Sequence, residues 1–196
     1  MIGGIDHDDA RKGRRTVATS FDLTGKTALV TGASSGLGAR FATVLADNGA
    51  HVVLVARRVE RLEKLRASIE AAGGTASVVA LDVTAFDAID PAIAAAEAEA
   101  GPIDILVNNS GVSTTQRLLD VTPADFDFVL DTNLKGAFFV AQAVGRRMVE
   151  RAKSQPGREA RIINVASMAG LKVLAQIGIY AMSKAAVIHM TRAMAL

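Results

Sequence analysis

The sequence predicts an α/β fold in which a parallel β-sheet is covered by helices on both faces. Three observations support this class. Short apolar runs alternate with helical patterns, several of these runs are continuously apolar as in strands buried on both faces, and glycine or proline separates many neighbouring elements. Right-handed crossovers return successive strands to one sheet. We therefore expect a Rossmann-like, doubly wound sheet.

The first half of the chain alternates four expected strands with three expected helices. The strands are 27–30, 51–55, 76–81 and 103–107. A glycine-rich turn follows the first strand, and the first helix then runs to Gly49. The next two helices are 60–72, which stops at Gly73-Gly74, and 87–100, which stops at Gly101-Pro102. This is the order of a repeated strand–helix unit.

The second half begins with a long expected helix. Thr122 suits the N-cap and Pro123 the first helical position, and the pattern runs toward Arg151. A fifth strand is expected at 161–165 and a last helix from about Ile179. No capping glycine or further strand follows before Leu196. We expect a sheet whose C-terminal strands are missing from this chain.

Composition narrows the class of protein. Half of the residues are hydrophobic, which suits one domain with a substantial core at 21–196, and residues 1–20 lack periodicity and are expected to form a flexible extension. The net charge is only +2, and the one basic cluster is Arg11-Lys12-Gly13-Arg14-Arg15, so nucleic acid is not an expected partner. No apolar run is long enough to cross a membrane or act as a signal peptide, and a cytoplasmic location is expected.

Metal and thiol chemistry are not expected. The chain has no cysteine, which excludes disulfides, thiolate zinc sites and a cysteine nucleophile. Its three histidines, His7, His51 and His189, are widely separated in sequence. No metal site is predicted.

A glycine-rich segment joins the first strand to the first helix. It reads Thr31-Gly32-Ala33-Ser34-Ser35-Gly36-Leu37-Gly38. In this context glycines let backbone amides approach a pyrophosphate at a helix N-terminus, although a tight turn without a ligand is the alternative. The spacing differs from the G-x-G-x-x-G of many dinucleotide domains.

The only tyrosine, Tyr180, stands four residues before Lys184 and thirteen after Ser167. On a helix this spacing of four places phenol and ammonium on one face, where the positive charge favours the phenolate. A tyrosine activated in this way exchanges protons near neutral pH. A solvated surface pair is the alternative interpretation.

From about Phe21 to Leu196 the chain resembles the short-chain dehydrogenase/reductase family. The resemblance rests on the T-G-x-x-x-G-x-G loop, on Tyr180-x-x-x-Lys184 with Ser167 upstream, and on three further matches in order: Asp82-Val83, Asn108-Asn109-Ser110-Gly111 and Thr132-Asn133-Leu134. Ser110 stands where the family usually has alanine. Family members continue beyond the last helix with strands and a substrate lid.

The resemblance implies a role for each matched residue. The catalytic set is Asn133, Ser167, Tyr180 and Lys184: Tyr180 as acid/base, Lys184 on the nicotinamide ribose, Ser167 on the substrate oxygen and Asn133 holding a water that relays protons. The expected cofactor-binding residues, beside Tyr180 and Lys184, are Gly32, Ser34, Ser35, Gly36, Leu37, Gly38, Arg57, Asp82, Val83, Asn109 and Gly111. Without the resemblance, Asp82 reads as a turn former and Asn133 as a helix-surface residue.

The end of the second strand predicts the cofactor. Ala56 stands where an acid would bind the ribose 2′-hydroxyl, and Arg57-Arg58 follows. The guanidinium of Arg57 suits a 2′-phosphate, so NADP(H) is favoured and NAD(H) remains possible. The alternative is that these arginines begin a solvated helix.

The expected activity is hydride transfer between the nicotinamide cofactor and a ketone or secondary alcohol. Apolar residues after Ser167 favour a hydrophobic ketone or, alternatively, pack under the last helix; they are Leu171, Val173, Leu174, Ile177 and Ile179. A catalytically silent dinucleotide sensor or interaction module and an NAD-preferring alcohol dehydrogenase are the rival functions. The resemblance also implies a homodimer or homotetramer, with the long helix and the Tyr180 helix at a two-fold axis.

Overall fold

The computed structural model describes residues 21–196, so the expected extension at 1–20 lies outside the described part. Five strands form one parallel sheet in the order β3-β2-β1-β4-β5. Their bounds are β1 Thr27–Thr31, β2 His51–Ala56, β3 Thr75–Ala80, β4 Ile103–Asn108 and β5 Arg161–Asn164. The expected doubly wound α/β class is confirmed.

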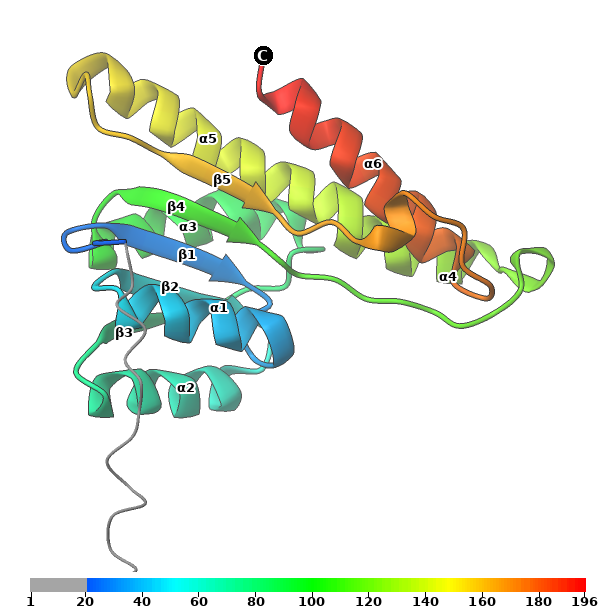
Figure 1. Ribbon diagram of the computed structural model, residues 1–196, viewed down its shortest axis with the longest axis horizontal. Helices are drawn as coiled ribbons and strands as arrows, with labels where there is room; N and C mark the ends of the chain where they lie inside the picture. Colours follow the sequence, from blue (N-terminus) through cyan, green and yellow to red (C-terminus); the bar gives the residue numbers. More distant parts are fainter. Residues whose placement is uncertain (1–20) are drawn as a thin grey trace, which may run out of the picture.

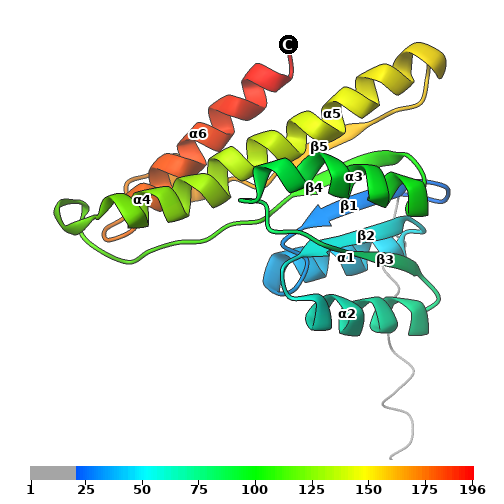
Figure 2. The ribbon, with the colours of Figure 1, turned by 180° about the vertical axis from the view of Figure 1, so that it is seen from behind.

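Helices cover both faces of the sheet, as Figures 1 and 2 show. On one face lie α1 (Gly36–Asp47) and α2 (Val59–Ala71), whose Ala42 and Leu62 join the apolar residues of β1 and β2. On the other lie α3 (Phe86–Ala100) and α5 (Ala137–Ser154), whose Ile89, Ile93 and Val144 pack with β1 and β4. The last helix, α6 (Gly178–Met194), packs on α5 through Ala137, Val187 and Met190.

Burial follows the position of each strand in the sheet. Every residue of β1 is buried, and β2 and β4 are buried at all but one residue. β3 and β5 occupy the two edges of this sheet and expose or half-expose most residues, although α2 and α3 cover β3 from opposite faces. An edge strand has an apolar sequence like that of a central strand, but it is more exposed because a neighbouring strand covers only one of its sides.

The long helix expected from Pro123 to Arg151 is interrupted. The structure has α4 (Pro123–Leu130), a π-helical segment (Asp131–Gly136) and then α5, which reaches Ser154. The predicted start is confirmed, because Thr122 and Asp125 form a capping box and Pro123 follows the N-cap. The π segment carries Asn133, and such segments are frequent at functional sites.

Candidate functional site

The glycine loop leaves β1 and opens α1 at the carboxyl edge of the sheet. Gly32 and Gly36 have φ of 66° and 57°, the left-handed region that glycine adopts without strain. At Gly38 a Cβ would collide with the Gly32 carbonyl oxygen and lie 2.6 Å from Asn109 Nδ2. Glycine therefore lets helix and strand pack closely here. The first turn of α1 has no acidic residue, so its free amides suit an anionic group.

Thr31 joins the glycine loop to the loop after β4. Its hydroxyl oxygen accepts hydrogen bonds from the amides of Asn109 (2.9 Å) and Ser110 (3.0 Å), and Asn109 Nδ2 donates to the Thr31 carbonyl (3.1 Å). Beside it, buried Asn108 donates to the carbonyl of Ala137 (2.6 Å). These bonds hold the ends of the two central strands in a fixed relation.

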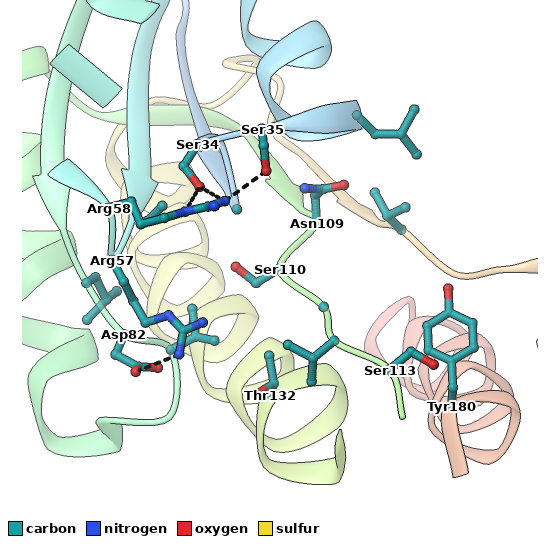
Figure 3. A pocket seen from close by; sticks show the side chains of 18 of the residues that line it. Ser34, Ser35, Arg57, Arg58, Asp82, Asn109, Ser110, Ser113, Thr132 and Tyr180 are labelled. Atoms are coloured by element: carbon teal, nitrogen blue, oxygen red, sulfur yellow. Dashed lines mark hydrogen bonds and ion pairs between the residues drawn. The ribbon is translucent and has the colours of Figure 1, made fainter. Parts of the chain in front are cut away.

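A cavity of about 520 Å³ runs along this edge, and Figure 3 shows residues from both of its ends. One end holds Arg57, Arg58 and Asp82, and the other holds Tyr180 and Lys184. Most of the expected site residues line it: Gly32, Ser34, Ser35, Leu37, Arg57, Asp82, Val83, Asn109, Gly111, Tyr180 and Lys184. Gly36, Gly38, Asn133 and Ser167 are not among its lining residues.

The two arginines after β2 point in different directions (Figure 3). Arg58 Nη2 donates to the hydroxyls of Ser34 (2.8 Å) and Ser35 (2.9 Å) in the glycine loop. Arg57 Nη1 instead lies 3.5 Å from Asp82 Oδ2. The sequence predicts Arg57 as the cofactor cation, whereas it is Arg58 that contacts the glycine loop. Residues beyond a strand end have no periodicity that predicts the direction of their side chains.

The carboxyl of Asp82 is held by its neighbours. The amide and hydroxyl of Thr84 donate to Asp82 Oδ1 at 3.0 and 2.8 Å. Partial burial alone would raise the pKa of Asp82, but the hydrogen bonds from Thr84 and the charge of Arg57 lower it below its ordinary value. Asp82 is therefore a fixed acceptor at this end of the cavity.

Tyr180 and Lys184 share the inner face of α6, as their spacing predicts. Lys184 is 5% exposed, its Nζ donates to the Val165 carbonyl (2.7 Å), and the same Nζ lies 5.7 Å from the centre of the Tyr180 ring. Burial lowers the pKa of Lys184 below its usual value. A buried ammonium thus stands beside a half-buried phenol that faces the cavity.

Asn133 joins two walls of the cavity from the π segment. Its Oδ1 accepts from the Val112 amide (2.7 Å), while its Nδ2 donates to the Val112 carbonyl (2.9 Å) and to Ser183 Oγ (3.0 Å). Ser183, which is fully buried, donates in turn to the Tyr180 carbonyl (2.7 Å). Both amide hydrogens of Asn133 are thus used by the protein. The helix-surface interpretation is wrong, because Asn133 is 1% exposed.

Ser167 follows β5 and caps a short 3₁₀ turn. Its Oγ accepts from the Ala169 amide at 3.1 Å. The apolar residues after it differ in exposure: Ile179 belongs to α6 and is buried, while Leu171 and Val173 are 75% and 99% exposed. Leu171, Val173 and Leu174 line a second hollow with Met182 rather than the Tyr180 cavity.

Within 21–196 no group of three or more histidine or acidic side chains is arranged to hold a metal ion. No helix in the same range is both long and apolar enough to span a bilayer.

A cavity lined by a glycine loop at a helix N-terminus and by a tyrosine–lysine pair suits a bound dinucleotide, and comparisons with known proteins agree with this fold. Residues 26–196 match the family model described as short chain dehydrogenase. Gluconate 5-dehydrogenase of Gluconobacter oxydans (strain 621H) is 40% identical over 175 residues, covering 89% of this chain and 66% of that protein. The chain thus spans about two thirds of the length of such relatives.

Two solved structures show the same fold with a cofactor bound. A gluconate 5-dehydrogenase from Burkholderia cenocepacia J2315, in complex with NADP and tartrate, has a TM-score of 0.82 and 36% identity, with 89% of this chain and 66% of that chain covered. A xylitol dehydrogenase with NAD⁺ bound has a TM-score of 0.83 and 36% identity, with 88% and 65% covered. Solved structures of this fold thus include one with NADP bound and one with NAD⁺ bound.

Proposed function

We propose that this chain, which belongs to the short chain dehydrogenase family, transfers a hydride between a nicotinamide cofactor and a ketone or secondary alcohol, with Tyr180 as the acid/base. One observation carries the proposal: a single cavity is lined by the glycine loop at one end and by Tyr180 and Lys184 at the other. A dinucleotide bound along it would present its two ends to these two groups of residues.

The residues present fit such a cofactor. The open N-terminus of α1 would receive the pyrophosphate, Asp82 would accept a hydrogen bond from the adenine, and Lys184 would bond the nicotinamide ribose. The reduced nicotinamide supplies the hydride when bound. The remaining chemistry belongs to side chains of this chain.

Tyr180 would give its phenolic proton to the carbonyl oxygen during reduction and take it back during oxidation. The ammonium of Lys184 stabilises the phenolate that remains. Ser167 would donate to the same substrate oxygen and stabilise its developing charge. Asn133 would act through its hydrogen bonds, which hold Val112 and the first turn of α6 in place. A proton-relaying water would donate to its Oδ1, which accepts one hydrogen bond from the Val112 amide and has a second lone pair.

We favour NADP(H) over NAD(H), with Arg58 as the main cation for the 2′-phosphate. Support comes from its hydrogen bonds to Ser34 and Ser35, which place one guanidinium and two hydroxyls around one point of the cavity. Arg57 contributes less, because its charge is compensated by Asp82. An NAD-preferring dehydrogenase is the competing possibility, since relatives with either cofactor share this fold.

Titration of nicotinamide fluorescence with NADPH and NADH tests this function. We expect tight binding of NADPH and weaker binding of NADH. Arg58→Ala should weaken NADPH binding by about 10- to 100-fold, the value of one or two hydrogen bonds between charged groups, and should change NADH binding by less than about threefold. Arg57→Ala is the matched control and should weaken NADPH binding less than Arg58→Ala does. Equal losses for both cofactors in Arg58→Ala would contradict the assignment.

We also propose that the protein forms a homodimer or homotetramer through α4–α5 and α6. Apolar side chains on these helices are partly exposed, among them Phe138 (37%), Val149 (63%) and Met182 (48%). Association about a two-fold axis would bury them against their own copies.

A further inference from the structure

Ser110 places a free hydroxyl in the middle of the cavity. It lies between the end that holds Arg57 and Asp82 and the end that holds Tyr180 (Figure 3). Its amide donates to Thr31 Oγ1 at 3.0 Å, which fixes the backbone. Among residues 21–196, however, the structure gives its Oγ no hydrogen-bond partner.

Other serines of the cavity differ in this respect. Ser34 and Ser35 accept from Arg58, and the hydroxyl of Ser113 donates to the Thr114 carbonyl at 3.2 Å. Ser110 is half-buried, so its hydroxyl gains from a hydrogen bond when a ligand displaces water from the cavity. An alanine at this position, which is the family's usual residue, offers no such bond.

The position of Ser110 indicates which part of a dinucleotide it meets. The residue packs against the glycine loop, since a Cβ on Gly32 would lie 3.1 Å from Ser110 Cα. In Figure 3 its hydroxyl points toward the arginine end of the cavity rather than toward Tyr180. The adenosine half of the cofactor would occupy that end, and its ribose lies between adenine and pyrophosphate.

We propose that Ser110 is a further cofactor-binding residue, whose hydroxyl forms a hydrogen bond with the 3′-hydroxyl of the adenosine ribose. The proposal rests on the function proposed above. The 3′-hydroxyl is the ribose group that NADH and NADPH share at this end, because the 2′ oxygen of NADPH carries the phosphate. Ser110 therefore strengthens binding of both cofactors without selecting between them.

The test is the affinity of the Ser110→Ala protein for four probes. NADPH, NADH and 2′,5′-ADP contain the adenosine 3′-hydroxyl, and reduced nicotinamide mononucleotide lacks the adenosine. We expect the first three to bind about three- to tenfold more weakly, as for the loss of one neutral hydrogen bond, and the mononucleotide to be unaffected. Calorimetric titration measures all four, and needs no turnover. Ser68→Ala, at an exposed position of α2, is the matched control.

Each contrary result has its own meaning. Unchanged affinity for the first three probes would overturn the role of Ser110 while leaving the proposed function intact. A loss confined to NADPH and 2′,5′-ADP would move the contact to the 2′-phosphate and overturn the ribose assignment. An equal loss for the mononucleotide would reveal a general change of the cavity and would also overturn it. Absence of binding by the unaltered protein would overturn the proposed function together with this inference.

Discussion

Hydrogen bonds involving the side chains of Thr31 and Asn133 set the geometry of the loops that line this cavity. The single hydroxyl of Thr31 fixes two consecutive amides after β4, and the single amide of Asn133 fixes both backbone groups of Val112. Without these two side chains, the backbone groups of the loop would form hydrogen bonds with water instead. Asn133 and Lys184 also lie close to Gly111: a Cβ there would be 3.4 Å from Asn133 Oδ1 and 3.7 Å from Lys184 Nζ.

Tyr180→Phe tests the acid/base at the residue scale. The ring would still pack beside Lys184 while the exchangeable proton is lost, so we expect turnover to be abolished and the dissociation constant for NADPH to stay within about threefold. Steady-state assays on a panel of ketones and the fluorescence titration measure the two effects separately. Unchanged turnover would refute the assignment. If the unaltered protein binds NADPH and turns over no ketone or alcohol, the silent-sensor function is favoured.

Asp104 supplies a second prediction at the residue scale. This carboxyl is 1% exposed, accepts from Arg158 Nε (2.6 Å) and Nη2 (2.8 Å), and accepts from the Thr27 amide (3.1 Å). Burial alone would raise the pKa of Asp104, but the hydrogen bonds from Arg158 and Thr27 and the charge of Arg158 lower it below its ordinary value. Breaking the pair by Asp104→Asn should lower the free energy of unfolding by about 3 kcal/mol at neutral pH.

The lowered pKa of Asp104 makes the stability difference between the unaltered protein and Asp104→Asn depend on pH. The folded protein holds the Asp104 proton less tightly than the unfolded chain does, so the stabilisation is complete above the ordinary aspartate pKa and is lost as pH falls through it toward the folded value. The stability gap between the unaltered protein and Asp104→Asn should narrow as pH falls from about 5 to about 3. Urea unfolding at a series of pH values measures it. A constant gap across this range would contradict the pair's role.

At the scale of elements, the π segment decides where Asn133 points. Gly136 is the last residue of this segment and packs tightly against the chain after β3. A Cβ on Gly136 would lie 2.7 Å from the Val83 carbonyl oxygen and 3.0 Å from the Asp131 carbonyl oxygen. Val83 lines the cavity, so a shift at Gly136 is transmitted to the site. A glycine that is poor for a helix is therefore required for close packing.

Gly136→Ala should consequently destabilise the protein by about 1 to 3 kcal/mol, as overpacking does, and should weaken NADPH binding. Gly145→Ala in α5 is the matched control, since the nearest atom to its added Cβ is Ile162 Cδ1 at an ordinary 3.6 Å. That variant should be neutral or stabilised by up to about 1 kcal/mol. Thermal unfolding with and without NADPH compares the two. Equal effects would show that helix propensity, not the contact with Val83, dominates.

The extent to which the elements could be predicted depends on which physical signal each one leaves. The five strands fall within a residue of their expected bounds, because short apolar runs between turn signals mark strands even at the edges of the sheet. The π segment leaves no such signal: it adds one residue to a helical turn without changing the composition around Asn133. Side-chain direction leaves no signal in the sequence either, so the bonds from Arg58 to Ser34 and Ser35 could not be predicted, and the role of Ser167 at the substrate oxygen stays a prediction.

At the scale of the whole molecule, the two faces of the sheet differ in what covers them. The α1–α2 face encloses a compact core with β1 and β2, whereas α4, α5 and α6 lie together on the other side and present Phe138, Val149 and Met182 to solvent. In Figures 1 and 2 the ribbons of α5 and α6 begin close together beside α4 and diverge toward their C-terminal ends at the rim of the molecule. Two such helices offer an apolar surface that a copy of the chain can cover with its own pair.

If this surface is the interface, light scattering should give a multiple of the 20.4 kDa chain mass, and Val149→Asp should shift the distribution toward the single chain. A carboxylate placed in an apolar interface loses hydration without gaining a partner, so association is penalised. Val44→Asp on α1, where valine is 39% exposed, is the control and should leave the mass unchanged. The cavity lies away from Val149, and NADPH affinity should persist in the dissociated protein. A single-chain mass for the unaltered protein would refute the proposed interface.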